Sequence, residues 1–219
     1  MSKIIIYVLC YDDATEELAN ARYRTFEWAR IYRIKNQTHL FEGIMYQEEL
    51  IKMYDEWKCA DFVGTISYNF TSKVPLKRLT DIIDRAINEK PDVTMFWSRT
   101  RDEGIGGHNK HLIQLYKSIL NMLISKTYPT VNQLYCFSNY WMCTPKHMLL
   151  YIDFFNRTLL PLLEENPHVW DNSFYSAGGL TPDHLLKITK RVSYYPFHPF
   201  INERLVAPYF QSINATILH

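Results

Sequence analysis

The sequence lacks the glycine-rich motifs by which many nucleotide-binding enzymes are recognised. It has 7 glycines in 219 residues, and the turn after the first apolar run, "CYDDAT" (10–15), contains none. A dinucleotide-binding domain needs G-x-G-x-x-G at this turn, so hydride transfer on NAD is disfavoured. The sequence also has no Walker phosphate loop, no G-x-S-x-G nucleophile elbow and no H-E-x-x-H metal motif. Several familiar enzyme classes are therefore disfavoured at the outset.

The chain also lacks an excess of charge of either sign. It contains 24 basic residues (Lys, Arg) and 23 acidic residues (Asp, Glu), which gives a formal net charge of +1. A protein that binds nucleic acid needs a basic surface to neutralise phosphates. We therefore expect no nucleic-acid partner.

Long apolar runs and paired cysteines are missing as well. No apolar stretch approaches the roughly 18 residues that span a bilayer, so no membrane span is expected. The start, "MSKIIIYVLC", is followed by acids without a small-residue cleavage site, which indicates a first strand and not a signal peptide. The four cysteines (Cys10, Cys59, Cys136, Cys143) form no C-x-x-C pair. Reduced thiols in a soluble, cytoplasmic protein are the expectation.

What the sequence does contain is an alternation of strand-like and helix-like segments. Strands are expected at 3–11, 38–47, 61–68, 92–98, 134–144 and 192–200, and helices at 13–34, 48–59, 75–88, 112–125, 145–165 and 184–191. Such an alternation predicts one domain over residues 1–219. Its expected fold is an α/β/α sandwich around a mainly parallel mixed sheet.

Polar residues follow three of the predicted strands, at the sheet edge where ligands bind in open α/β folds. These strand tips are Cys10-Tyr11-Asp12, Ser67-Tyr68-Asn69 and Trp97-Ser98-Arg99. We therefore expect a ligand-binding site where these tips meet.

The stretch "ADFVGTISYNFTSKVPLKRLTDII" (60–83) carries a family resemblance. A buried strand, a three-residue polar tip and a helix led by proline resemble the metal-binding segment of glycosyltransferases with the GT-A fold. "GGLTPDHLLKITKRVSYYP" resembles their late segment, in which an acid opens a helix, and "FINERLVAPYF" is similar to the ends of polysaccharide-building transferases. As a whole, the chain resembles the N-terminal glycosyltransferase domains with which large algal DNA viruses (chlorella viruses) glycosylate their major capsid protein.

The resemblance implies a UDP-linked hexose or deoxyhexose as donor and a glycan on a capsid glycoprotein as acceptor. It also implies that the chain is the N-terminal domain of a longer polypeptide. The donor would lie against Cys10, Tyr11, Asp12, Ser67, Tyr68, Asn69 and Arg99. A tyrosine ring would stack on uracil and an acid would bind a ribose hydroxyl. The alternative for Asp12 or Asp13 is that it caps the first helix, for which Thr15 is a further N-cap candidate.

Two acids are candidates for the catalytic base that removes a proton from the acceptor hydroxyl. Asp183, in "TPDHLL", stands where the family places a carboxylate near the acceptor, and Asp171, in "VWDNSF", is the second candidate. The alternative for Asp183 is an ordinary acid in the first turn of a helix, stabilised by the helix dipole.

The metal site of the family is altered in this chain. Family members hold Mn²⁺ or Mg²⁺ with Asp-x-Asp, but the tip here is Ser67-Tyr68-Asn69, which lacks both carboxylates. Asn69 and the late His198 remain as metal-ligand candidates, although Asn69 can equally end a strand and His198 can pack among its aromatic neighbours. Four cations near predicted tips and loops could replace part of the metal's charge: Lys73, Arg99, Arg101 and Lys110.

The leading hypothesis is therefore a UDP-sugar-dependent glycosyltransferase. A sugar-nucleotide or glycan binding module without catalysis is the alternative, because the Asp-x-Asp acids are missing.

Overall fold

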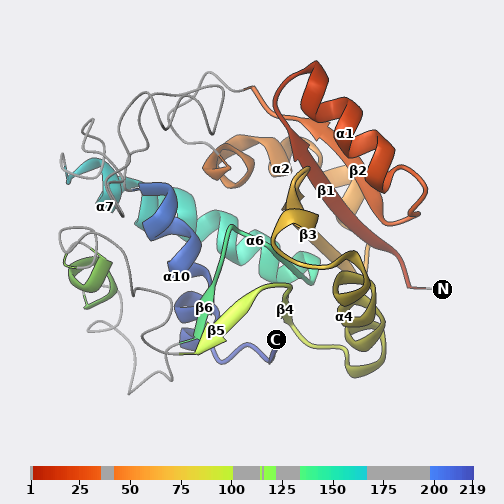
Figure 1. Cartoon of the computed structure of the whole chain (residues 1–219). Helices are drawn as coiled ribbons and strands as arrows, with labels where there is room; N and C mark the ends of the chain where they lie inside the picture. Colours follow the sequence, from red (N-terminus) through yellow and green to blue (C-terminus); the bar gives the residue numbers. More distant parts are fainter. Residues whose placement is uncertain (1, 36–41, 101–113, 115, 122–133, 167–197) are drawn as a thin grey trace.

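A six-stranded mixed sheet forms the centre of the molecule (Figure 1). The computed structural model describes residues 2–35, 42–100, 114, 116–121, 134–166 and 198–219. The sheet contains β1 (Ile4–Cys10), β2 (Ala29–Arg33), β3 (Phe62–Ser67), β4 (Val93–Met95), β7 (Trp141–Cys143) and β8 (Ile217–Leu218), in the order β2-β1-β3-β7-β4-β8. β7 runs antiparallel to β3 and β4, and the other pairs are parallel. The predicted α/β class with a mainly parallel mixed sheet is confirmed.

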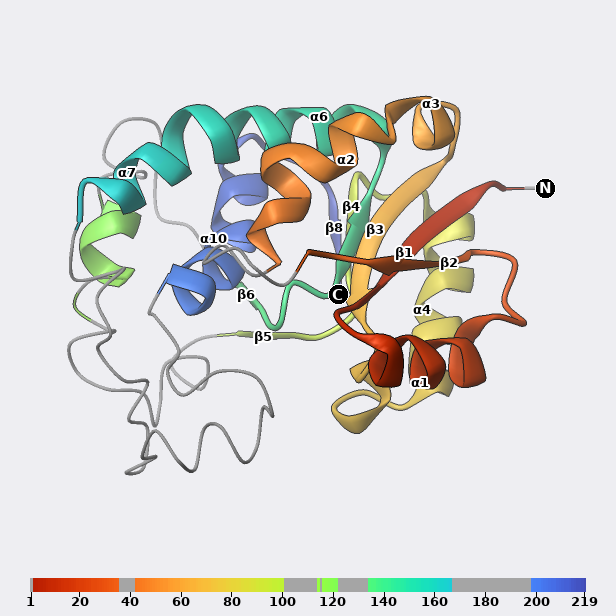
Figure 2. The ribbon, with the colours of Figure 1, turned by 90° about the horizontal axis from the view of Figure 1, so that it is seen from above.

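Helices cover both faces of this sheet, which gives three layers (Figure 2). One face carries α1 (Asp13–Tyr23) and α4 (Leu76–Glu89), and the other carries α2 (Leu50–Lys52), α3 (Tyr54–Trp57), α6 (Pro145–Phe154) and α10 (His198–Ser212). α6 continues through the π-helical turn η4 (Phe155–Leu159) into α7 (Leu160–Glu164). All seven residues of β1 are buried because the strand is covered on both sides. Among the described residues, no helix has the length and apolar character needed to cross a membrane.

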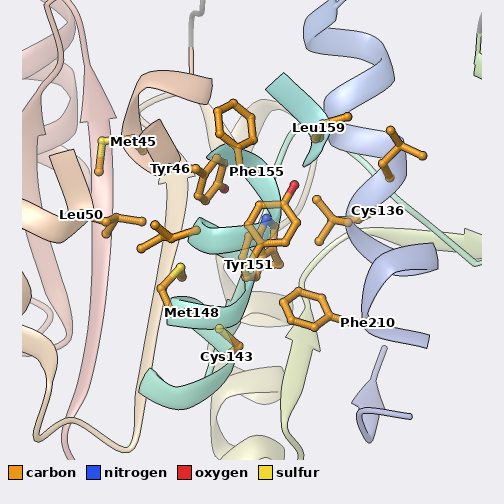
Figure 3. Packing of buried hydrophobic residues seen from close by; sticks show 14 of the residues in the cluster. Met45, Tyr46, Leu50, Cys136, Cys143, Met148, Tyr151, Phe155, Leu159 and Phe210 are labelled. Atoms are coloured by element: carbon orange, nitrogen blue, oxygen red, sulfur yellow. The ribbon is translucent and has the colours of Figure 1, made fainter. Parts of the chain in front are cut away.

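The larger core cluster centres on an aromatic group between α6, α10 and the sheet (Figure 3). The Tyr151 ring lies 5.0 Å from Tyr46, 4.9 Å from Trp141 and 5.6 Å from Phe210, centroid to centroid. Its hydroxyl donates a hydrogen bond of 3.1 Å to Oδ1 of Asn202. Aromatic packing with a satisfied buried hydroxyl thus joins α10 to α6 and the sheet.

Several predicted elements are confirmed with small shifts at their ends. The strands at 3–11 and 61–68 are β1 and β3, the helix at 75–88 is α4, and the helix at 145–165 is α6-η4-α7. The described residues within 112–125 are helical. All four cysteines are free.

The single helix predicted over 13–34 is wrong beyond Tyr23. α1 ends there, and residues 29–33 form β2, which pairs in parallel with β1. The carbonyl of Trp28 accepts a hydrogen bond of 2.8 Å from the Ile6 amide, which begins this pairing. β2 is a half-exposed edge strand, so its side chains did not show the buried alternation of a typical strand.

The strand predicted at 38–47 is also wrong over its described part. Residues 43–52 are helical and include the π-helical turn η1 (Met45–Glu49) and α2. Residues 36–41 lie outside the described residues. Met45, Tyr46 and Leu50 are fully buried, and this spacing places them on one helical face against the core. The predicted helix at 48–59 is broken at Met53, between α2 and α3.

Three further strand predictions need correction. The strand at 92–98 divides into β4 and β5 (Ser98–Thr100), and the strand at 134–144 divides into β6 (Leu134–Cys136) and β7. β5 and β6 form a separate antiparallel pair. The strand predicted at 192–200 is wrong for its last three residues, because α10 begins at His198; residues 192–197 lie outside the described residues.

Acid is expected to weaken the junction between β8 and α6. Thr216 donates from its amide and its hydroxyl to Oδ2 of Asp92, at 2.8 Å each, and Nδ1 of His147 lies 3.5 Å from Oδ1 of the same carboxylate. Burial lowers the pKa of His147 in spite of the carboxylate nearby. Burial alone would raise the pKa of Asp92, but the Thr216 hydrogen bonds and His147 outweigh it and lower this pKa.

Both shifts make the unfolded chain bind protons more readily than the folded chain. We therefore expect the melting temperature to fall as the pH drops from 7 through the folded pKa of His147, and to fall again below the ordinary pKa of aspartate, near 3.8. Thermal unfolding measured between pH 7 and 5 tests the first step. The variant His147→Gln should flatten it, and an unchanged slope in that variant would contradict the assignment.

Candidate functional site

The carboxyl ends of β1 and β3 lie side by side. Leu9 is opposite Ser67 in the register, and the Tyr68 amide donates a hydrogen bond of 2.9 Å to the carbonyl of Leu9. The rings of Tyr11 and Tyr68 then meet edge to face, with their centroids 6.2 Å apart. The first two strand tips therefore meet, as the sequence predicted.

Tyr11 is fixed in this position by a carboxylate that sequence reasoning missed. Its hydroxyl donates a hydrogen bond of 2.7 Å to Oε1 of Glu42, which lies just before η1. Both side chains are half-buried, and Tyr11 packs against the larger core cluster. The ring at the end of β1 is thus held in place by a hydrogen bond and by packing.

The other two residues of the first tip have structural partners. Asp12, not Thr15, is the N-cap of α1: Oδ1 of Asp12 accepts a hydrogen bond of 2.8 Å from the Thr15 amide, and Thr15 in turn accepts from the Asp12 amide. The Cys10 thiol is buried and donates to the carbonyl of Tyr32 at 3.3 Å. Of the three residues of this tip, Tyr11 is the one whose half-buried ring meets the second tip.

At the second tip, Ser67 and Asn69 also have partners. The Ser67 hydroxyl lies 2.6 Å from the Tyr140 hydroxyl, and burial raises the pKa of Tyr140. The carbonyl of Asn69 accepts hydrogen bonds from the amide and the hydroxyl of Ser72, at 3.0 and 2.8 Å, and so begins the 3₁₀ turn η2 (Phe70–Ser72). The tip is a strand end that turns at once into a short helix.

A tight turn between β6 and β7 contributes to the same edge of the sheet. Ser138 and Asn139 both have left-handed backbone conformations, with φ of 58° and 53°, and the Tyr140 amide bonds to the carbonyl of Phe137 at 3.2 Å. Two successive positive φ values are typical of a type I′ turn, in which serine is an unusual residue. Asn139 is only 5% exposed, and its Oδ1 has no hydrogen-bond partner in the part of the chain that the structure describes.

Lys73 brings a positive charge to this turn. Its Nζ donates a hydrogen bond of 2.7 Å to the Ser138 hydroxyl and lies 5.6 Å from the ring centroid of Trp97 and 5.5 Å from that of Tyr140. Cation–π contacts of this length are attractive. A second cation, Arg22 of α1, donates to the carbonyl of Tyr68 at 3.1 Å. The edge formed by the strand tips therefore carries aromatic rings and two cations, beside the carboxylate of Glu42.

Glu203 of α10 supports the turn from below. Its Oε2 accepts a hydrogen bond of 2.7 Å from the Ser138 amide, and its Oε1 is bound by Nη1 of Arg204. Burial raises the pKa of Glu203, against the opposing influence of Arg204 and Lys73. Both residues lie in the sequence motif "FINERL", but nothing in this motif predicted that Glu203 contacts the Ser138 turn.

We call the residues of this edge the strand-tip cluster. It consists of Tyr11, Glu42, Ser67, Tyr68, Lys73, Trp97, Ser138, Asn139, Tyr140, Glu203 and Arg204.

Among the described residues, no acidic cluster accompanies Asn69 and His198, the metal ligands that the sequence suggested. His198 is 2% exposed at the start of α10, packed in the interior. Within the described residues, no group of three or more His, Cys, Asp or Glu side chains could hold a metal ion. Mn²⁺ and Mg²⁺ require several hard oxygen ligands, and the engaged hydroxyl of Ser67 with the amide of Asn69 does not provide such a set.

The remaining predicted site residues are Asp171, Asp183 and Arg99. Asp171 and Asp183 lie outside the described residues. Arg99, the last residue of the third tip, lies in β5, opposite Tyr135 of β6 in the register.

A cleft of about 280 Å³ lies at the opposite edge of the sheet, near the chain start and α4. Trp28, Arg30, Thr80 and Asp84 are among its lining residues. None of the predicted donor-binding residues lines it. The candidate site is therefore the strand-tip cluster, where tyrosine rings, cations and the buried amide of Asn139 meet.

No protein-family model, no curated protein and no solved structure matches this chain. The functional assignment therefore depends on the sequence motifs and on the geometry of the strand-tip cluster.

Proposed function

We propose that this chain is a glycosyltransferase that moves a hexose or deoxyhexose from a UDP-sugar to a hydroxyl of a glycan. The observation that carries the proposal is the adjacency of the β1 and β3 ends, at the edge where open α/β sheets bind ligands. The GT-A fold and a capsid glycoprotein as the natural acceptor belong to the same proposal, on the strength of the sequence resemblance.

The strand-tip cluster offers groups of the kind that a nucleotide sugar needs. The half-buried rings of Tyr11 and Tyr68 provide surfaces for uracil, and Lys73 provides charge for the diphosphate. In the reaction, the acceptor oxygen attacks the anomeric carbon while the bond from that carbon to the diphosphate oxygen breaks. The electron pair leaves with UDP, and a carboxylate takes the proton of the acceptor hydroxyl. Positioning of the two substrates and stabilisation of the leaving group account for most of the rate enhancement.

UDP-sugars are expected to raise the melting temperature of the protein. A ligand at 100 times its dissociation constant adds about 2.7 kcal/mol to the free energy of unfolding, or roughly 5–10 °C for a domain of this size. A thermal-shift panel of UDP-, GDP- and ADP-sugars, each with and without Mn²⁺, measures this. Tyr11→Ala should remove most of the shift, while Tyr54→Ala, at an exposed tyrosine of α3, should leave it intact. No shift with any nucleotide sugar would contradict the proposal.

A non-catalytic sugar-nucleotide binding module is the second candidate. The absence of carboxylates at Ser67 and Asn69 favours it. It predicts the same thermal shift without consumption of donor, so a UDP-release assay with glycan acceptors separates the two functions.

A further inference from the structure

We propose that Lys73 binds the diphosphate of the donor and supplies the positive charge that a divalent metal ion supplies at an Asp-x-Asp tip. This inference rests on the proposed function, and it specifies how UDP, the leaving group of the transfer reaction, is stabilised.

The carboxylates of the strand-tip cluster already have partners. Glu42 accepts the hydrogen bond of Tyr11, and Glu203 is bound by Arg204 and by the Ser138 amide. A hard divalent cation would have to replace one of these partners to gain a charged oxygen. The described residues of this edge therefore fit an organic cation better than a metal ion.

Lys73 lies beside the strand tips and differs from the lysines that form ion pairs elsewhere in the described residues. Lys52, Lys58 and Lys77 each form an ion pair with a nearby carboxylate. Lys73 remains exposed and forms no ion pair with any described residue. Its ammonium group is held instead by a neutral hydroxyl and two aromatic rings, and the Glu203 carboxylate, on which its charge acts, forms its ion pair with Arg204. Such a cation beside a strand tip is suited to an anionic ligand.

The groups that hold the ammonium group are themselves anchored in the fold. Tyr140 and Trp97 adjoin the central sheet, and the Ser138 turn is held by the half-buried Glu203. A cation fixed in advance can bind the leaving diphosphate without reorganisation as its charge grows. Lys73 donates hydrogen bonds in this step and transfers no proton, because the acceptor's proton goes to the carboxylate base.

Calorimetric titration of UDP in the presence of EDTA tests the inference. Lys73→Met removes the charge but keeps an apolar stem against the two rings. We expect it to weaken UDP binding by about tenfold to a hundredfold, as for the loss of a charge-assisted hydrogen bond. Binding of uridine, which has no diphosphate, should change by less than about twofold. Lys77→Met, which removes a paired lysine of α4, is the matched control and should bind UDP normally.

Titration of the unaltered protein gives a second, independent readout. UDP should bind with similar affinity in EDTA and in Mn²⁺. A requirement for Mn²⁺, or unchanged UDP affinity in Lys73→Met, would overturn the role of Lys73 and leave the proposed function standing. Failure of uridine, UDP and every UDP-sugar to bind the unaltered protein would instead refute the proposed function itself.

Discussion

Replacing Gly64 with alanine is expected to leave little folded protein. A Cβ atom at this position would lie 2.4 Å from the carbonyl oxygen of Trp141, 2.5 Å from Cβ of Met142 and 2.7 Å from Cα of Met142. Two of these three atoms belong to the backbone of β7. We expect a loss of at least about 3 kcal/mol in the free energy of unfolding, a large part of the stability of a typical domain. Urea unfolding or the yield of folded protein measures it.

The size of this effect follows from the position of Gly64 in the sheet. It lies in β3, between Ile6 of β1 on one side and Met142 of β7 on the other. Neither neighbouring strand can move away without breaking hydrogen bonds of the sheet, so a small rearrangement cannot relieve the steric clash. A small shift would also displace Ser67, at the end of the same strand, and with it the strand-tip cluster.

Gly43→Ala is the matched control. Its new Cβ would meet Cζ of Phe155 at 3.1 Å and Nδ2 of Asn202 at 3.6 Å, which are the ends of side chains. Gly43 lies in a helical segment, where alanine is favoured over glycine by up to about 1 kcal/mol. We expect the free energy of unfolding of this variant to change by less than about 1 kcal/mol overall. Equal urea midpoints for the two variants would show that β7 does not confine Gly64 as described.

The parts of the fold that the sequence predicted are those with strong local signals. β1 is a continuous apolar run because both of its faces are covered, and α4 begins directly after Pro75. β2 was missed because it is a half-exposed edge strand with arginines at both of its outward positions, Arg30 and Arg33. The break between β6 and β7 was missed because its turn uses Ser138 and Asn139 in left-handed conformations without a glycine.

The sequence predicted only part of the candidate site, namely the residues at the ends of strands. The carboxyl ends of parallel strands share one edge of a sheet, so the alternation of strands and helices predicted a common edge for Tyr11 and Tyr68. That β1 and β3 are direct neighbours is known only from the structure. Glu42 and Glu203 reach the cluster only through the tertiary packing of η1 and α10. No local pattern marks such residues, because their role depends on contacts with residues far away in the sequence.

Under the proposed function, Asp183→Asn is expected to lower the rate of sugar transfer by about 10²- to 10⁴-fold, the usual contribution of a general base. The sequence "TPDHLL" gives Asp183 two possible roles, as the base or as an acid in the first turn of a helix. Asparagine separates them, because it cannot accept the proton but alters the helix-dipole interaction by only about 0.3–1 kcal/mol. Turnover should therefore fall while the melting temperature changes little. The rate should be measured with the UDP-sugar that gives the largest thermal shift.

Asp171→Asn provides the comparison, since it removes the second candidate base by the same change. If Asp183 is the base, the Asp171 variant should keep most of its turnover. The transfer rate of the unaltered protein should then rise with pH as one carboxylate ionises. If turnover is lost only in the Asp171 variant, the base is Asp171, and Asp183 opens a helix. Normal turnover in both variants would mean that neither carboxylate removes the acceptor's proton. The pH dependence of the rate in each variant then separates loss of a base from loss of substrate binding. Loss of the base removes the rise of the rate with pH, whereas loss of substrate binding leaves that rise in place.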